Sequence, residues 1–150
     1  MNIYQKIFAV QQDPKMARLV RTELNKFQNY HYFTESQLLT KLRPLLKEQR
    51  LILLFSDDKE LGFTHEKLEK EHVVKYVKKM EIIDIDKPED RIKEEFWACG
   101  QNIDLAKAKG AADTYAIKYF LSKFFLSPVT NDIDPDKWGR TSPKFEKSIK

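Results

Sequence analysis

The chain has 150 residues, of which 41% are hydrophobic and 33% charged, with a formal net charge of +4. This composition predicts a single globular domain with its own core and argues against a disordered chain. No apolar run reaches the ~20 residues that span a bilayer, and Cys99 is the only cysteine. We therefore expect a cytoplasmic protein without disulfide bonds or membrane contact.

The basic residues are unevenly distributed. Residues 1–50 hold nine Lys and Arg against four Asp and Glu, and residues 101–150 hold nine against six. The middle third is acidic, with nine against thirteen. Two basic segments that converge on one face would suit a polyanionic partner, although surface lysines also serve solubility alone.

The N-terminal segments have the spacing of helices. Apolar residues at helical spacing predict a helix over 2–12 and a second over 14–27, which begins at Pro14. The polar and aromatic segment that follows predicts a turn and a short extended piece, which carries Tyr30 and Tyr32.

A third helix is predicted over 36–50, with Thr34 or Ser36 as its cap. Pro44 lies inside this segment and should kink the helix or mark its boundary. The short apolar run at 51–57 is bounded by charged residues and predicts a buried strand.

A long hairpin is predicted in the middle of the chain. The charged segment 58–71 predicts a connection with at most a helical turn. Alternation predicts a strand over 72–85, and residues 91–100 return as its partner after a turn. Lys78 falls on the mainly apolar side of the first strand and breaks the pattern.

The segment 106–126 predicts a closing helix that is apolar over most of its circumference, and therefore buried on most sides. One basic stripe remains on it, comprising Lys107, Ala111, Thr114, Lys118 and Ser122. We predict an α+β fold in which an antiparallel sheet of three or four strands, with the long hairpin, is flanked by the N-terminal helices and this core helix. Three prolines and no periodicity make residues 127–150 an extended or disordered tail, so the domain covers residues 1–126.

The sequence offers little catalytic chemistry. It has no Gly-rich phosphate loop, and its three histidines show no metal-ligand spacing with Cys99. We expect no ATP hydrolysis, no cofactor, no metal site and no catalytic residue. One enzyme alternative stays open, a Mg²⁺-dependent nuclease built from carboxylates of the hairpin. Its candidate ligands are Asp84, Asp86, Glu89, Asp90, Glu94 and Glu95.

The segment "GAADTYAIKYFL", followed by "NDIDPD", resembles the end of the Erf (essential recombination function) family of phage single-strand annealing proteins. Upstream segments resemble the opening helix and the aromatic, helix and strand region of that family, so the resemblance covers most of residues 2–136. Asp113-Thr114 departs from the family's usual Ser-Ser. The matching positions are Gly110, Ala111, Ala112, Tyr115, Lys118, Tyr119 and the aspartates from Asp132.

The resemblance implies ATP-independent binding and annealing of single-stranded DNA in phage-type homologous recombination. It also implies a homo-oligomer, as a ring or filament, and the host cytoplasm if the protein is phage-encoded. A third alternative is a diverged interaction module that keeps the fold and binds a protein through its tail.

The predicted DNA groove follows the basic stripe. Lys107 and Lys118 lie eleven residues apart, which spans roughly 16 Å of helix and several phosphates. A stripe that is polar only because it is exposed would look the same, and the tyrosines could equally pack in the core. The predicted DNA-binding residues are Lys107, Lys109, Thr114, Lys118, Lys75, Lys79, Tyr30 and Tyr32. Lys75 and Lys79 could instead pair with Glu94 or Glu95 across the hairpin, and Tyr115 and Tyr119 are predicted to be mostly core.

Overall fold

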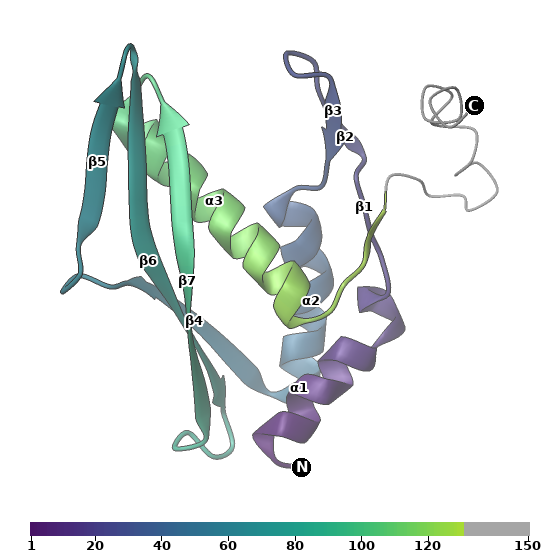
Figure 1. Cartoon of the computed structure of the whole chain (residues 1–150). Helices are drawn as coiled ribbons and strands as arrows, with labels where there is room; N and C mark the ends of the chain where they lie inside the picture. Colours follow the sequence, from purple (N-terminus) through teal and green to yellow (C-terminus); the bar gives the residue numbers. More distant parts are fainter. Residues whose placement is uncertain (131–150) are drawn as a thin grey trace, which may run out of the picture.

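The computed structural model describes residues 1–130 (Figure 1). Residues 131–150, which include the acidic run from Asp132 and most of the predicted tail, lie outside the described part of the chain. The α+β fold is confirmed, with helices before the sheet and one long helix after it. The helical elements are α1 (Ile3–Gln12), the 3-10 turn η1 (Pro14–Met16), α2 (Glu35–Gln49) and α3 (Leu105–Phe124).

The main sheet is built around β6 (Glu71–Asp84), its longest strand. On one side β6 pairs in antiparallel fashion with β7 (Arg91–Asn102) along nearly its whole length, which confirms the long hairpin. On the other side two shorter strands share it: β4 (Leu51–Asp57) pairs with the second half and β5 (Phe63–Leu68) with the first. The result is a four-stranded antiparallel sheet with β7 at one edge.

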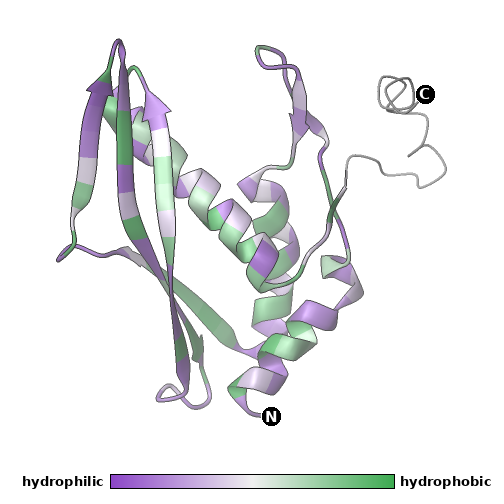
Figure 2. Ribbon diagram, in the orientation of Figure 1, coloured by the Kyte–Doolittle hydropathy of each residue, from purple (hydrophilic) through white to green (hydrophobic). Residues whose placement is uncertain are grey.

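Strand alternation determines which face of the sheet α3 covers. Val74 and Tyr76 of β6 and Ala98 of β7 are buried against Ala108 and Ala112 of α3. The residues between them point to the other face, because successive side chains in a strand alternate. Figure 2 shows this alternation as bands of different hydropathy along β6.

Gly100 allows α3 to approach β7 closely. A Cβ atom at this position would lie 2.5 Å from the carbonyl oxygen of Ala108 and 2.7 Å from the backbone nitrogen of Ala112. Both neighbours are backbone atoms of a helix and cannot rotate away. This packing therefore requires small residues on both elements, Gly100 on β7 and Ala108 and Ala112 on α3.

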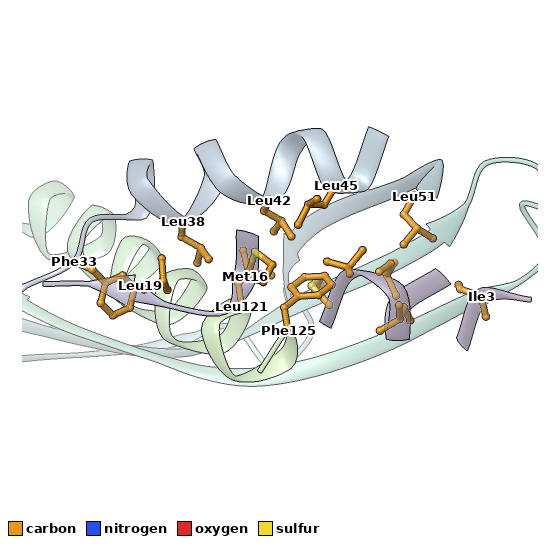
Figure 3. Packing of buried hydrophobic residues seen from close by; sticks show 14 residues of the cluster. Ile3, Met16, Leu19, Phe33, Leu38, Leu42, Leu45, Leu51, Leu121 and Phe125 are labelled. Carbon is orange, nitrogen blue, oxygen red and sulfur yellow. The ribbon is translucent and has the colours of Figure 1, made fainter. Parts of the chain in front are cut away.

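The second half of α3 lies between the sheet and α2 (Figure 1). Leu121 and Phe125 pack there against the apolar face of α2 and against α1, in one continuous core (Figure 3). The fully buried members of that core include Val10, Met16, Leu19, Phe33, Leu38, Leu42, Met80, Ile82, Leu121 and Phe125. No helix in residues 1–130 is long and apolar enough to cross a membrane.

The predicted helix over 14–27 is wrong. Pro14 does begin a helical turn, but η1 ends at Met16. Leu19 and Val20 then form β1 (Leu19–Val20), which pairs in parallel with β8 (Val129–Thr130). The pairing with a segment more than 100 residues away outweighs the local helical spacing.

The segment after β1 forms a small hairpin that projects from the body (Figure 1). It pairs β2 (Glu23–Asn25) with β3 (Tyr30–Tyr32), which confirms the extended piece around Tyr30 and Tyr32. Residues 127–130, at the start of the predicted tail, are part of the fold, since Ser127 is buried and β8 follows it.

Two further details correct the expectations from the sequence. The charged segment 58–71 contains β5 and no helical turn, and every residue of β5 is exposed, which explains the missing apolar signal. Pro44 lies inside α2, which continues to Gln49, so Pro44 marks no boundary, whereas the expected N-cap Thr34 is confirmed.

We predict opposite effects for alanine at two glycines. Gly100→Ala should lower the free energy of unfolding by about 1–3 kcal/mol, because its methyl group has no space between β7 and α3. Gly110→Ala should raise it by about 0.5–1 kcal/mol, because Gly110 lies in α3 and no atom of another element comes within 4 Å of the place that its methyl group would take. Urea unfolding of both variants measures this difference. A Gly100→Ala variant whose free energy of unfolding equals that of the parent protein would contradict the close packing.

Candidate nucleic-acid interface

Four tyrosines from two elements surround one lysine. Tyr30 and Tyr32 come from β3, Tyr115 and Tyr119 from α3, and Lys118 lies among them. The Lys118 Nζ is 4.7 Å from the ring centre of Tyr115, 5.0 Å from Tyr119 and 5.5 Å from Tyr32. We call these five residues the tyrosine cluster. It brings together three residues predicted for DNA binding: Tyr30, Tyr32 and Lys118.

Lys118 is buried, which corrects the predicted stripe. Its exposed fraction is 3%, and its Nζ donates a hydrogen bond to the carbonyl oxygen of Phe33 at 2.9 Å. Burial lowers the pKa of Lys118 from its ordinary value. Phe33, directly after β3, and α2 cover this side of α3, so Lys118 and Ser122 are buried, whereas the predicted stripe had them exposed.

Tyr115 and Tyr119, rather than Lys118 and Ser122, are exposed in this part of α3. Their exposed fractions are 43% and 45%, and their rings stack with centres 6.1 Å apart and planes inclined by 10°. The interpretation of these residues as mostly core is therefore wrong. They present two parallel aromatic rings to solvent, one helical turn apart.

A hydrogen bond joins the two halves of the cluster. The hydroxyl oxygens of Tyr30 and Tyr115 are 3.3 Å apart. This bond lowers the pKa of Tyr30 and, together with burial, raises the pKa of Tyr115 to about 12. The β2–β3 hairpin is thereby attached to α3 at the aromatic surface.

A groove of about 420 Å³ continues this surface between α3 and β7. Its floor includes Phe96 and Phe120, whose rings stack 4.1 Å apart. Lys123 and Trp97 also line the groove, and Trp97, between Phe96 and Ala98 on β7, takes an outward-facing position in which it is 74% exposed. The sequence analysis missed both residues. A large aromatic on an outward-facing position of an edge strand was the available signal for Trp97.

The other predicted residues of α3 lie nearer its start. Lys107 and Thr114 are exposed. Lys109 is held by the protein itself, since its Nζ lies 3.0 Å from Asp57 and 3.3 Å from Asp113 and stands over the ring of Tyr76. A continuous basic stripe from Lys107 to Lys118 is therefore absent from α3.

Lys75 and Lys79 lie on the face of the sheet turned away from α3. They alternate with Val74, Tyr76 and Lys78, whose side chains are buried on the α3 side. Lys79 forms an ion pair with Asp58 at 3.6 Å. The predicted DNA groove along α3 therefore cannot include Lys75 and Lys79, which belong to the outer face of the sheet.

Lys78 is buried within a network of ion pairs. Its Nζ is 2.9 Å from Asp57 and 3.3 Å from Asp113, and Tyr76 donates a hydrogen bond to the same Asp113. Burial lowers the pKa of Lys78, but the bond to Asp57 and the nearby carboxylates outweigh it, and the net shift is upward. This network explains why a lysine interrupts the apolar side of β6.

The carboxylates of the nuclease alternative are engaged or separated. Asp84 pairs with Lys6 at 2.7 Å, and Asp86 pairs with both Lys6 at 3.1 Å and Arg50 at 2.7 Å. Within residues 1–130, no three side chains of His, Cys, Asp or Glu are grouped to hold a metal ion. The geometry thus gives this alternative no support.

The model of the ERF superfamily matches residues 3–149. The chain belongs to this superfamily. The resemblance found in the sequence is thereby confirmed, whereas no curated protein and no solved structure matches the chain. In this ERF protein the motif residues lie along α3: Ala112 packs on the sheet, and Tyr115, Lys118 and Tyr119 belong to the tyrosine cluster.

The Lys6–Asp84 pair predicts an acid-sensitive fold. The hydrogen bond from Lys6 holds the pKa of Asp84 below its ordinary value of 3.8. The stabilisation is therefore present above about pH 4 and is lost as the pH falls through the lowered pKa. Asp84→Asn should lower the melting temperature at pH 7 and flatten its decline in acid.

Glu89→Gln, an exposed change in the same turn, is the matched control and should leave both quantities unchanged. Melting temperatures between pH 2 and 7 provide the measurement. An Asp84→Asn curve parallel to that of the parent protein would contradict the role of the pair.

Proposed function

We propose that this ERF-superfamily chain binds single-stranded DNA and anneals complementary strands without a nucleotide cofactor. The family match supports single-strand annealing and phage recombination at the level of the family. The strand would lie along the exposed rings of Tyr115 and Tyr119 and in the groove beside β7. Such a protein would act in the cytoplasm, which is the host cytoplasm if the protein is phage-encoded.

The stacked pair of Tyr115 and Tyr119 is the observation that carries the proposal. Every base has a flat π face, so stacking on aromatic rings binds a strand without reading its sequence. Two parallel rings on consecutive turns of a rigid helix form such a platform. The stacked rings of Phe96 and Phe120 continue the aromatic surface into the groove.

Positive charge lies beneath and beside this platform. The Lys118 ammonium group lies 4.7 Å from the ring centre of Tyr115 and 5.0 Å from that of Tyr119, and Lys123 and Lys107 are exposed on α3. Exposed cations attract the phosphate backbone irrespective of sequence. The combination of ring faces and cations suits a single strand better than a duplex, whose base faces are covered.

Oligomerisation remains part of the proposal. Strand β7 lies at one edge of the sheet, and β4 and β5 share the other. Edge strands offer unpaired backbone groups to a neighbouring copy. A ring or filament would then repeat the DNA-binding surface along a strand.

The interaction-module alternative places binding in the tail, beyond the described residues. A protein partner through that tail is compatible with DNA binding by α3, so we keep it as an additional hypothesis. Annealing by a chain that ends after Thr130 would assign the activity to the folded part.

We predict that Tyr115→Ala combined with Tyr119→Ala weakens single-stranded DNA binding at least tenfold, because each lost stacking contact is worth about 1–3 kcal/mol. Annealing of two complementary labelled oligonucleotides without ATP should slow accordingly. Fluorescence anisotropy at two salt concentrations measures the affinity.

Lys75→Ala combined with Lys79→Ala is the control on the opposite face of the sheet. It should reduce affinity by less than the tyrosine pair. The reverse ranking would place the strand on that outer face, and a parent protein that neither binds nor anneals would overturn the proposed function.

A further inference from the structure

The tip of the β2–β3 hairpin carries a phenylalanine entirely in solvent. The exposed fraction of Phe27 is 103%, the largest of any exposed hydrophobic residue in residues 1–130. It lies in the four-residue turn 26–29 between Asn25 and Tyr30. The hairpin thus holds a large apolar ring away from the core.

The turn around Phe27 has a defined geometry. The side-chain oxygen of Asn25 accepts hydrogen bonds from the backbone nitrogens of Phe27 at 3.0 Å and Gln28 at 3.1 Å. Asn29 adopts a left-handed conformation with φ of 54°, which closes the turn. The ring is therefore presented from a structured tip.

A chain of hydrogen bonds links this tip to the tyrosine cluster. The side-chain nitrogen of Asn25 donates to the hydroxyl oxygen of Tyr30 at 3.4 Å, and that hydroxyl is hydrogen-bonded to Tyr115. The position of Phe27 is thus fixed relative to the aromatic platform on α3. Lys26, next to it, is also exposed and supplies a cation.

We propose that Phe27 inserts between adjacent bases of the single strand that lies on the tyrosine cluster. The inference rests on the proposed function and adds a residue to it. Apolar side chains that enter between base steps unstack them, and the bases then cover the apolar ring. The neighbouring cation and the polar links to Tyr30 and Tyr115 favour a ligand with flat faces and negative charges over a purely apolar partner.

The loop 58–62 offers a matched control. The side-chain oxygen of Asp58 accepts hydrogen bonds from the backbone nitrogens of Glu60 and Leu61, both at 3.1 Å, as Asn25 does in the hairpin. Leu61 is 71% exposed, and its loop connects β4 to β5, at the edge of the sheet opposite β7. Leu61→Ala therefore removes an exposed apolar side chain from a similar turn that lies away from the β2–β3 hairpin.

The experiment compares the full-length parent, Phe27→Ala, Phe27→Tyr and Leu61→Ala. The probe is an oligo(dA) strand with one 2-aminopurine, an adenine analogue whose fluorescence increases when it leaves the base stack. Phe27→Ala should weaken binding about tenfold with an unchanged salt dependence, and should reduce the fluorescence increase at saturating protein. Phe27→Tyr and Leu61→Ala should behave like the parent.

Two results would overturn the inference while leaving the proposed function in place. One is a Phe27→Ala protein that binds and unstacks the strand as the parent does. The other is a Phe27→Ala protein whose oligomer is smaller without DNA, because Phe27 would then contact a second copy. A parent protein that fails to bind the strand at all would overturn both proposals.

Discussion

The close approach of α3 to β7 at Gly100 determines which side chains of the helix remain in solvent. Ala108 and Ala112 face the sheet because only small residues fit against Gly100, and this contact fixes the rotation of the helix about its axis. Further along, α3 meets a second neighbour. Leu121 and Phe125 enter the core shared with α1 and α2, and Phe33, directly after β3, covers the side that holds Lys118. The exposed face therefore shifts around the helix from Thr114 to Tyr115 and Tyr119. The aromatic platform is a consequence of packing at the two ends of one helix.

The buried position of Lys118 is energetically costly, since its pKa is lowered by desolvation. The carbonyl oxygen of Phe33 and the surrounding ring faces compensate part of that cost. The same ammonium group lies against the tyrosine rings and, through its bond to Phe33, holds the segment that follows the hairpin. A buried charge can thus influence a surface that it does not reach. The sequence suggested an exposed row of lysines along α3. In the structure the lysine is buried under aromatic rings, so the proposed DNA binding depends on the rings as much as on the charge.

Much of the fold was predictable because the signals are local. Strands 51–57, 72–85 and 91–100 follow from alternation and from charged boundaries, and α1 and α2 follow from helical spacing and capping. The failures have non-local causes. Leu19 and Val20 fit a helix but pair with Val129 and Thr130, and β5 has no apolar side because all its residues are exposed. The site was predicted in part: Tyr30, Tyr32 and Lys118 do come together. Which side of α3 is covered depends on β3 and α2, and a helical wheel contains no information on either.

The chemistry of annealing explains why a stacking surface suits the proposed function better than the predicted basic stripe. A protein that anneals strands must hold one strand firmly and leave the Watson–Crick edges of its bases open to a second. Hydrogen bonds to base edges would block that pairing, whereas contacts to ring faces and phosphates leave the edges free. Tyr115 and Tyr119 offer ring faces, and Lys123, which lines the same groove, offers charge. With few exposed cations on α3, affinity would depend more on stacking than on charge. Such a surface can release its strand into a duplex, because stacking between neighbouring base pairs replaces the stacking on the tyrosine rings.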